Sequence, residues 1–356
     1  MKKMLLLAAF AGVALTSCVN EEITNVEHAQ VMKLDVPAMS KTRAKVKGEI
    51  NGVHYDKGED FKIFSKIYKG AFTGWSTSTG IKDYFSAAGD VATNEGNGSQ
   101  YWSTATTYYW PDAEYSLAFA AYSPAVLTTA PENIEFTSNG LQITGFQTEA
   151  DANEQYDLMY SDRVIDRNKK DNGSSAVPLV FRHALTSIIF SSEKEDENVG
   201  YTIKSATLTG SFIQKADFNQ NIVENDNLTK GTAKWENPET ATLANYEPDF
   251  GDDFQVTTTP TQFTQGKSAL LLIPQDVPAD AAVTIEYVKT SSGVDTDNTV
   301  TIKLSDFRQE GGHEITTWEM GKRYVYRVAF GQNKKIYFEP TTEDWVQVGT
   351  LIYEIQ

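Results

Sequence analysis

The chain has 356 residues, of which 40% are hydrophobic and 12% aromatic, a composition that supports packed cores and excludes an intrinsically disordered protein. It carries 31 basic and 48 acidic residues, and its formal net charge of −17 would repel nucleic acid and anionic membranes. Its single cysteine excludes a framework of intrachain disulfides, so burial and strand pairing must hold the fold together.

The first seventeen residues have the layout of a secretory signal peptide. Two lysines form a positive start, an apolar stretch runs from Met4 to Leu15, and small residues close the segment. The stretch is shorter than the roughly 20 apolar residues that a membrane-spanning helix needs. Its last residues, Leu-Thr-Ser before Cys18, resemble a bacterial lipobox. We therefore expect a signal peptide over residues 1–17 and a lipid on Cys18; the alternative is an ordinary signal with a buried cysteine.

The next patterned segment is "VMKLDV", residues 31–36. Successive side chains of a strand point to opposite faces, so Met32, Leu34 and Val36 share one face while a lysine and an aspartate share the other. The segment is predicted to be a strand with one buried face.

A polar segment, "PAMSKTRAK" at residues 37–45, follows this strand and begins with proline. It contains the pair Arg43 and Ala44 in a stretch with no apolar face. Exposed polar loops of this kind are where proteases cut, and any surface linker can also hold an arginine by chance. Residues 18–43 are thus expected to form a leader that ends at a candidate cleavage point.

The rest of the chain shows the period of two that is typical of strands. The apolar runs are short, rich in β-branched and aromatic residues, and separated by Gly, Asn, Asp and Pro. We find no convincing run of ten residues with helical spacing, so the pattern favours all-β sandwiches over a parallel α/β fold. The predicted strands are 61–68, 115–122, 141–146, 201–210, 268–274, 282–288, 299–304, 323–331 and 335–340.

Polar stretches between these runs suggest how the chain is divided. The segment 164–178 interrupts the strand pattern with charged and small residues, so we expect two domains, residues 44–174 and 175–356. Long polar insertions at 76–100 and 224–253 are expected to be surface loops or excursions from the core.

The residues that could carry chemistry do not form a recognisable site. No histidine stands at metal-ligand spacing with another histidine or a cysteine, and His183, inside the apolar run "FRHALTSIIF", is expected to be a hydrogen-bonded structural residue. The string "DTDN" at 295–298 has alternating carboxylates that could hold calcium, but it lacks the glycine and distal glutamate of a calcium loop, and a turn explains it as well. No nucleophile elbow, phosphate loop or catalytic cysteine is present. We expect neither an enzyme nor a cofactor.

The tryptophans allow two interpretations. Trp110 and Trp318 sit at strand edges, where aromatic rings commonly close a sandwich core. Trp75 and Trp102 flank a long polar insertion and could be exposed, as in a surface that stacks on sugars. The second interpretation gives an alternative function, a glycan-binding surface lipoprotein that stays monomeric.

Four stretches together resemble the fimbrillin family, the type V pilins of Gram-negative anaerobes. The resemblance covers nearly the whole chain, and it implies two transthyretin-like, Greek-key β-sandwich domains and export as an outer-membrane lipoprotein. It further implies cleavage by an arginine-specific protease, which matches Arg43 and Ala44, and assembly with other copies or related pilin subunits into a surface fimbria. The four stretches are "YYWPDAEYSLAFAAYSP" (108–124), "VPLVFRHALTSIIFSS" (177–192), "ALLLIPQDVPADAAVTIEYV" (269–288) and "WEMGKRYVYRVAFGQNKKIYFEPTTEDW" (318–345).

The C-terminal "TLIYEIQ", residues 350–356, provides a possible donor strand for such assembly. Leu351, Tyr353 and Ile355 share a face, and burying three such side chains contributes roughly 5–9 kcal/mol at about 1.5–3 kcal/mol each. If cleavage removed the strand at 31–36, this tail could pair in the vacated groove of another subunit, and head-to-tail transfer would give a filament. The simpler alternative is that the tail is the last strand of its own domain, as in a fimbrial anchor or tip adhesin that does not donate it.

Overall fold

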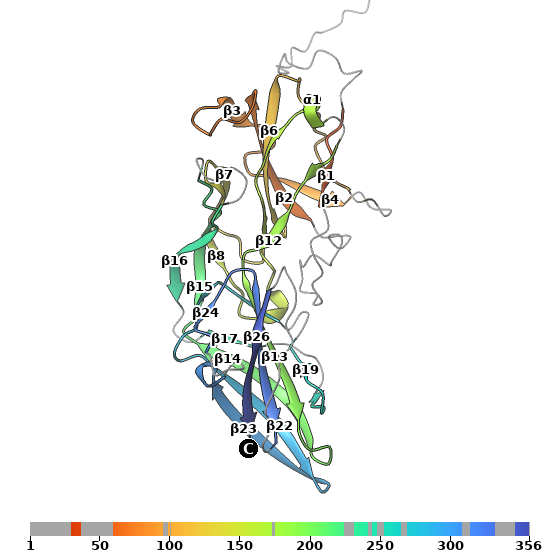
Figure 1. The fold of residues 1–356 in the computed structure, drawn as a ribbon, viewed down its shortest axis with the longest axis vertical. Helices are drawn as coiled ribbons and strands as arrows, with labels where there is room; N and C mark the ends of the chain where they lie inside the picture. Colours follow the sequence, from red (N-terminus) through yellow and green to blue (C-terminus); the bar gives the residue numbers. More distant parts are fainter. Residues whose placement is uncertain are drawn as a thin grey trace, which may run out of the picture.

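The computed structural model describes residues 30–36, 60–94, 99, 101–172, 175–223, 231–240, 244–247, 253–264, 269–307, 314–331 and, by strand pairing alone, 346–355. It is an elongated all-β molecule (Figure 1). The described helical pieces are one turn of α-helix, α1 (Lys169–Asn172), and short 3-10 turns at Ala152–Glu154 and Leu304–Asp306. Within the described residues, no helix has the length and apolar character needed to cross a membrane.

The largest sheet occupies the upper part of Figure 1. Its strands pair in the order β11-β1-β5-β4-β2-β6-β9-β12, with β3 beside β2 and β10 beside β6. Its aromatic and aliphatic side chains build one hydrophobic core, which includes Phe61, Trp102 and Phe181. The strands are β1 (Leu34–Asp35), β2 (Phe61–Lys69), β3 (Thr79–Asp83), β4 (Asp90–Asn94), β5 (Tyr101–Thr104), β6 (Tyr115–Ser123), β9 (Met159–Ser161), β10 (Val164–Arg167), β11 (Val177–Pro178) and β12 (Phe181–His183).

A second sheet lies beside the first and combines strands from both sides of residue 174. It pairs in the order β16-β15-β8-β7, with β7 (Asn133–Thr137), β8 (Gly140–Gln147), β15 (Ile213–Asn219) and β16 (Lys234–Thr240). Trp235 of β16 packs on Phe146 of β8, and its indole N–H donates to the carbonyl of Ala184 (2.8 Å). The two expected domains therefore share a sheet and a hydrophobic core along the described chain.

Two further sheets form a sandwich in the lower part of Figure 1. Ile188 and Tyr326 from one sheet meet Ile203 and Ile285 from the other in a common core. The first sheet has β13 (Thr186–Lys194), β19 (Thr261–Gln262), β20 (Leu270–Leu272), β25 (Lys322–Phe330) and β26 (Val346–Ile355). The second has β14 (Gly200–Gly210), β17 (Ala244–Tyr246), β18 (Phe254–Gln255), β22 (Ala282–Ser291) and β23 (Val294–Lys303). Separately, β21 (Gln275–Asp276) and β24 (Thr317–Trp318) form a two-stranded sheet.

Most of the predicted strands are confirmed. The runs 61–68, 115–122, 141–146, 201–210, 282–288, 299–304 and 323–331 coincide with β2, β6, β8, β14, β22, β23 and β25, and 268–274 contains β20. The run 335–340 lies outside the described residues. The string "DTDN" forms part of β23 rather than a turn, and the turn precedes it at Ser292 and Gly293.

The prediction that the two polar insertions are loops was wrong. The first contains β3 and β4, and the second contains β16 and β17. β4 is held between β2 and β5 although only Ala92 among its side chains is buried. A strand that buries one side chain has too few apolar residues to show an alternating pattern, so backbone pairing with distant strands decided these segments.

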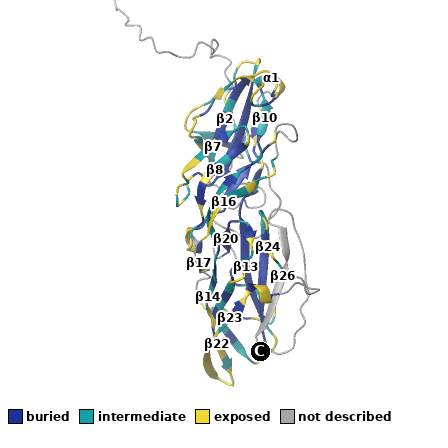
Figure 2. Cartoon of the chain, turned by 90° about the vertical axis from the view of Figure 1, so that its left-hand side faces the viewer, coloured by how far each residue is buried: buried dark blue, intermediate teal, exposed yellow. Residues whose placement is uncertain are grey.

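The expectation of an exposed ring was wrong for Trp102, and the expectation of core packing is confirmed for Trp110 and Trp318. Trp102 is 0% exposed and packs against Phe61, so it cannot stack on a sugar. Trp75 is half-buried, with its ring edge-on to Phe136. Trp110 and Trp318 close hydrophobic cores, as expected. Figure 2 shows the buried residues as a continuous interior along the molecule.

The expectation for His183 is confirmed. The residue is 7% exposed, and its Nδ1 lies 2.6 Å from Oδ2 of Asp157, which is fully buried. A buried polar side chain of this kind needs a hydrogen-bond partner, because leaving it unpaired in an apolar core costs free energy. His183 therefore belongs to the packing of β12.

Buried tyrosines predict a loss of stability at high pH. Burial raises the pKa of Tyr84, Tyr122 and Tyr324 to about 12, above the ordinary value of about 10. Between these values the unfolded chain releases protons that the folded chain retains. The free energy of unfolding should be independent of these groups below pH ~10 and fall as the pH rises towards ~12. Denaturant unfolding at several alkaline pH values checks this, with the tyrosinate absorbance of the folded and the unfolded chain recorded in parallel. Equal tyrosinate absorbance of the folded and unfolded chains at every pH would contradict it.

Candidate strand-exchange groove

Residues 30–36 lie in the interior of the largest sheet, between two strands, rather than at its edge. β1 is antiparallel to β5, with Leu34 opposite Trp102, and parallel to β11, with Leu34 opposite Val177. It thus occupies a slot between two parts of the chain that are distant in sequence (Figure 1). We call this slot the groove and residues 30–36 its occupant.

Backbone hydrogen bonds hold the occupant on both sides. On one side the N–H of Met32 donates to the carbonyl of Tyr108 (2.9 Å), and the N–H of Trp110 donates to that of Gln30 (3.0 Å). On the other side the N–H of Val177 donates to the carbonyl of Lys33 and that of Leu179 to Asp35, both at 2.8 Å. Removal of the occupant would leave donors and acceptors without partners along both walls.

The side chains of the occupant follow the alternation read from the sequence. Met32, Leu34 and Val36 are 6%, 2% and 0% exposed, and all three belong to the core of the sheet. Val31 points away and is 46% exposed, and the ammonium of Lys33 lies 4.9 Å from the centre of the Tyr101 ring. The groove is therefore an apolar slot that takes every second side chain of an extended strand.

The far wall of the groove is one continuous segment that closes the sheet on itself. β11 pairs with the occupant, and β12, which begins three residues after Pro178, pairs with β9 at the other end of the sheet. The strand order begins at β11 and ends at β12. Because these two strands belong to one continuous segment, that segment joins the two ends of the sheet. This closing segment was not recognised from the sequence as a groove wall, although its alternation of Val177, Leu179, Phe181 and His183 signals a strand with one buried face.

The tail of the chain lies far from the groove in the same subunit. β26 is parallel to β25, with Leu351 opposite Tyr326, Tyr353 opposite Val328 and Ile355 opposite Phe330. It ends the order β19-β13-β25-β26, so one neighbour holds it in the described sheet. The groove is in the upper half of Figure 1 and β26 in the lower half. The other predicted site residues, Cys18, Arg43 and Ala44, lie outside the described residues.

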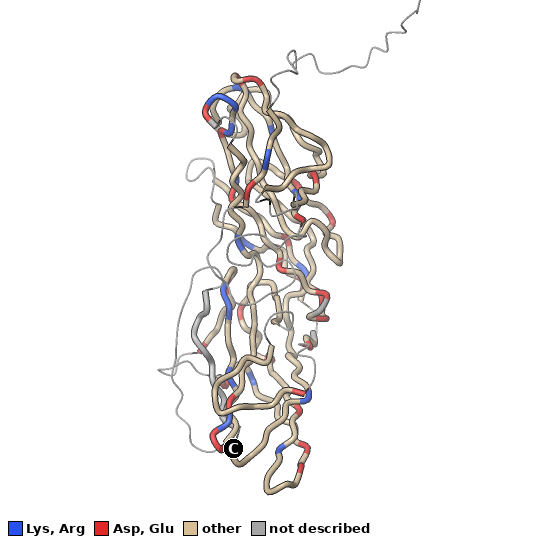
Figure 3. Tube along the Cα trace, turned by 90° about the vertical axis from the view of Figure 1, so that its right-hand side faces the viewer, with Lys and Arg blue, Asp and Glu red and all other residues tan. Residues whose placement is uncertain are grey.

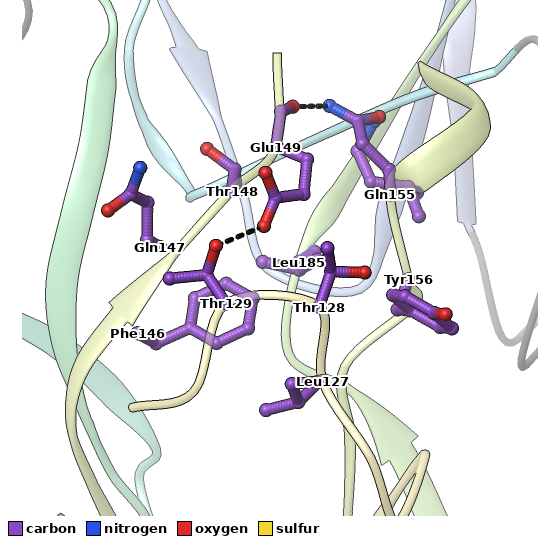
Figure 4. Close-up of a pocket in the computed structure, with 11 residues that line it drawn as sticks. Leu127, Thr128, Thr129, Phe146, Gln147, Thr148, Glu149, Gln155, Tyr156 and Leu185 are labelled. Atoms are coloured by element: carbon purple, nitrogen blue, oxygen red, sulfur yellow. Dashed lines mark hydrogen bonds between the residues drawn. The ribbon is translucent and has the colours of Figure 1, made fainter. Parts of the chain in front are cut away.

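The pocket drawn in Figure 4 is too small for an organic ligand. This pocket, lined by Phe146, Glu149, Gln155 and Leu271, among others, has a volume of about 10 Å³, enough for roughly one water molecule (Figure 4). Gln155 fills one side of it, donating to the carbonyl of Glu149 (2.7 Å) and accepting from the N–H of Leu271 (2.7 Å). In the part of the chain that the structure describes, no group of three or more His, Cys, Asp or Glu residues is placed to hold a metal ion.

Charged residues of both signs are interspersed along the described chain (Figure 3). Several form pairs between a strand and a segment distant in sequence, such as Lys215 with Glu132 (2.8 Å) and Arg182 with Asp162 (2.7 Å). In the view of Figure 3, the Lys and Arg residues of the described chain are separated by Asp, Glu and uncharged residues.

Comparison with known proteins identifies the family. A family described as fimbrillin-like matches residues 42–345. The fold is similar to that of a fimbrial protein from Bacteroides vulgatus (TM-score 0.57, 17% identity, 89% of this chain and 100% of that one). It is also similar to a candidate cell adhesion protein from Bacteroides uniformis (TM-score 0.50, 15% identity, 86% and 94%). No curated protein sequence matches the chain at a significant level. The chain belongs to the fimbrillin-like family, whose members are structural proteins rather than enzymes.

Proposed function

We propose that this protein is a structural subunit of a cell-surface fimbria, exported as a lipoprotein precursor and assembled by exchange of one strand for another. The observation that carries the proposal is the groove: a short segment near the N-terminus is paired on both sides and buries three side chains in the core. A segment held in this way can be replaced by any strand with matching alternation, because backbone pairing is independent of sequence.

In this proposal proteolysis empties the groove. Cleavage between Arg43 and Ala44 separates the lipid on Cys18 and the occupant from the rest of the chain. Before the cut the occupant is tethered to its own groove, and tethering within one chain gives an effective concentration of the order of mM that excludes competitors. After the cut the occupant is lost by dilution, so an untethered strand from another subunit can take its place.

The tail is the proposed replacement. Leu351, Tyr353 and Ile355 repeat the spacing of Met32, Leu34 and Val36, so both strands present three apolar side chains to one face. β26 has a single neighbour in its described sheet, so its release breaks one ladder of hydrogen bonds. Since the groove and the tail lie in opposite halves of an elongated molecule, exchange between subunits extends in one direction and supports a filament. Adhesion of the cell is the role that we infer for such a filament.

Digestion of the precursor tests the proposal. The chain lacking residues 1–18 is treated with an arginine-specific protease, and the new N-terminus and the size distribution are measured. We expect a chain that starts at Ala44 and forms ladders or fibres, and no polymer from an Arg43→Gln variant or from a chain lacking residues 350–356. A folded, correctly cut protein that remains monomeric would refute strand exchange.

One observation favours a second candidate, a fimbrial anchor or tip adhesin. The tail is paired with β25 in its own subunit, as expected if it is the permanent last strand of that sheet. Such a subunit would accept or donate at one end only. When it is mixed with a polymerising partner in the digestion experiment, it would be found only at one end of each filament. The glycan-binding alternative loses one of its two tryptophans, because Trp102 is buried, whereas Trp75 is half-buried.

A further inference from the structure

The wall of the groove formed by residues 176–184 depends on the occupant for much of its attachment. The amides of Val177 and Leu179 donate to the occupant, and the described pairing of β11 is with β1 alone. When the occupant leaves, this stretch loses a complete side of hydrogen bonds. A wall that then detached would leave an incoming strand with one wall instead of two.

Two arginines fasten the wall at places that do not involve the occupant. Beyond the stretch that borders the groove, Arg182 forms a two-pronged pair with Asp162, from Nε to Oδ1 (2.7 Å) and from Nη2 to Oδ2 (2.9 Å). Before that stretch, Nη2 of Arg167 donates to the carbonyl of Ala176 (3.0 Å). Paired N–H donors on a carboxylate fix direction as well as distance. The two arginines therefore hold the wall at both ends.

The surroundings of Arg182 reinforce its position. The N–H of Asp162 donates to the carbonyl of Val180 (2.8 Å), and the N–H of Ala184 donates to that of Leu158 (2.8 Å). Between these bonds, β12 pairs with β9 over Phe181, Arg182 and His183. The strand that carries Arg182 is thus attached to the body of the sheet independently of the groove.

We infer that Arg182 and Arg167 are positioning residues that keep the wall in place while the groove is empty. They define a preformed site for the incoming strand, which lowers the ordering cost of binding. In the precursor the occupant and the arginines fix the same wall, so loss of one arginine has little effect. In the empty subunit the wall is held by the pairing of β12 with β9 and by these two arginines, which fix the ends of the stretch that has lost its partner. The inference rests on the proposed function only in that the groove is emptied during assembly.

Peptide rebinding to the chain lacking residues 1–18 tests the inference. A site for a sequence-specific protease is placed within residues 37–59 of the chain lacking residues 1–18, and after cleavage the occupant is exchanged for a labelled peptide of residues 30–36. We expect Arg182→Gln to slow the association of this peptide by about fivefold, as an ion pair of this kind contributes. Arg182→Lys, which keeps the charge but not the two-pronged geometry, should restore part of the rate.

Two controls separate positioning from general stability. Lys215→Gln breaks ion pairs with Glu132 (2.8 Å) and Glu239 (3.3 Å) in another sheet and should leave the association rate unchanged. The midpoint of denaturant unfolding should be the same for Arg182→Gln and Lys215→Gln in the uncut chain. Hydrogen exchange in the empty chain should be faster at residues 180–184 in Arg182→Gln than in the unaltered protein. Equal association rates for the two variants, or a fall in stability of the uncut Arg182→Gln chain, would overturn the inference.

A second peptide distinguishes this inference from the proposed function. The peptide of residues 346–356 is tested in the same assay. If the 30–36 peptide depends on Arg182 but the tail peptide does not bind, the role of Arg182 stands and donation of the tail is refuted. If both peptides bind and neither association rate changes in Arg182→Gln, donation of the tail stands and the positioning role of Arg182 is refuted.

Discussion

Replacing Leu34 by aspartate should expel the occupant from the groove without proteolysis. Leu34 is 2% exposed at the centre of the occupant, and it is opposite Trp102 on one side and Val177 on the other. A carboxylate at this place has to give up its hydration, which costs several kcal/mol in an apolar core. Because the occupant is short, its detachment is the cheaper response. We expect the free energy of unfolding to fall by about 3–5 kcal/mol, to the value of a chain lacking residues 30–36.

Val31→Asp is the matched control for this variant. It places the same carboxylate three residues earlier, on a side chain that is 46% exposed, and should change the free energy of unfolding by less than about 1 kcal/mol. Denaturant unfolding of both variants and of the truncated chain gives the comparison. If Leu34→Asp and Val31→Asp lowered the free energy of unfolding by similar amounts, the assignment of one buried and one exposed face to this segment would be wrong.

Trp318 should be among the most sensitive residues of the lower sandwich. Its ring is 0% exposed and stacks on Phe212 at 5.8 Å between centres, and its indole N–H donates to the hydroxyl of Tyr326 (2.9 Å), which is also 0% exposed. Trp318→Ala leaves a cavity and should lower the free energy of unfolding by about 3–5 kcal/mol. Trp318→Phe retains a ring but removes the donor, and should lower it by about 1–3 kcal/mol.

A double-mutant cycle separates the hydrogen bond from the packing. Tyr326→Phe alone leaves the indole N–H without the acceptor seen here, whereas Trp318→Phe with Tyr326→Phe removes both polar groups. The double variant should therefore be more stable than the sum of the two single losses predicts. Unfolding free energies of the four proteins are measured in one denaturant. Strict additivity would indicate that the bond contributes nothing beyond the volume of the rings.

The sequence was informative wherever one residue type recurs at every second position over a long run. The strands at 201–210 and 282–288 were predicted for this reason, and His183 was recognised as a packed residue because apolar residues surround it. The occupant of the groove was predicted as a half-buried strand from three side chains alone, and the structure buries the same three. The direction in which a side chain points depends on the local period, which needs no knowledge of distant residues.

Tertiary structure decided which strands are neighbours. Leu34 is between Trp102 and Val177, which are far from it and from each other in sequence, and no local pattern encodes that placement. The burial of Trp102, the strands within the polar insertions and the closing segment from β11 to β12 were missed for the same reason. By itself, the sequence determined that this is an all-β chain with a strand near each end that has an apolar face. Only the folded sheets decided that the first strand fills a two-walled groove while the last has one neighbour, because hydrogen-bond partners in a sheet are chosen by the whole fold.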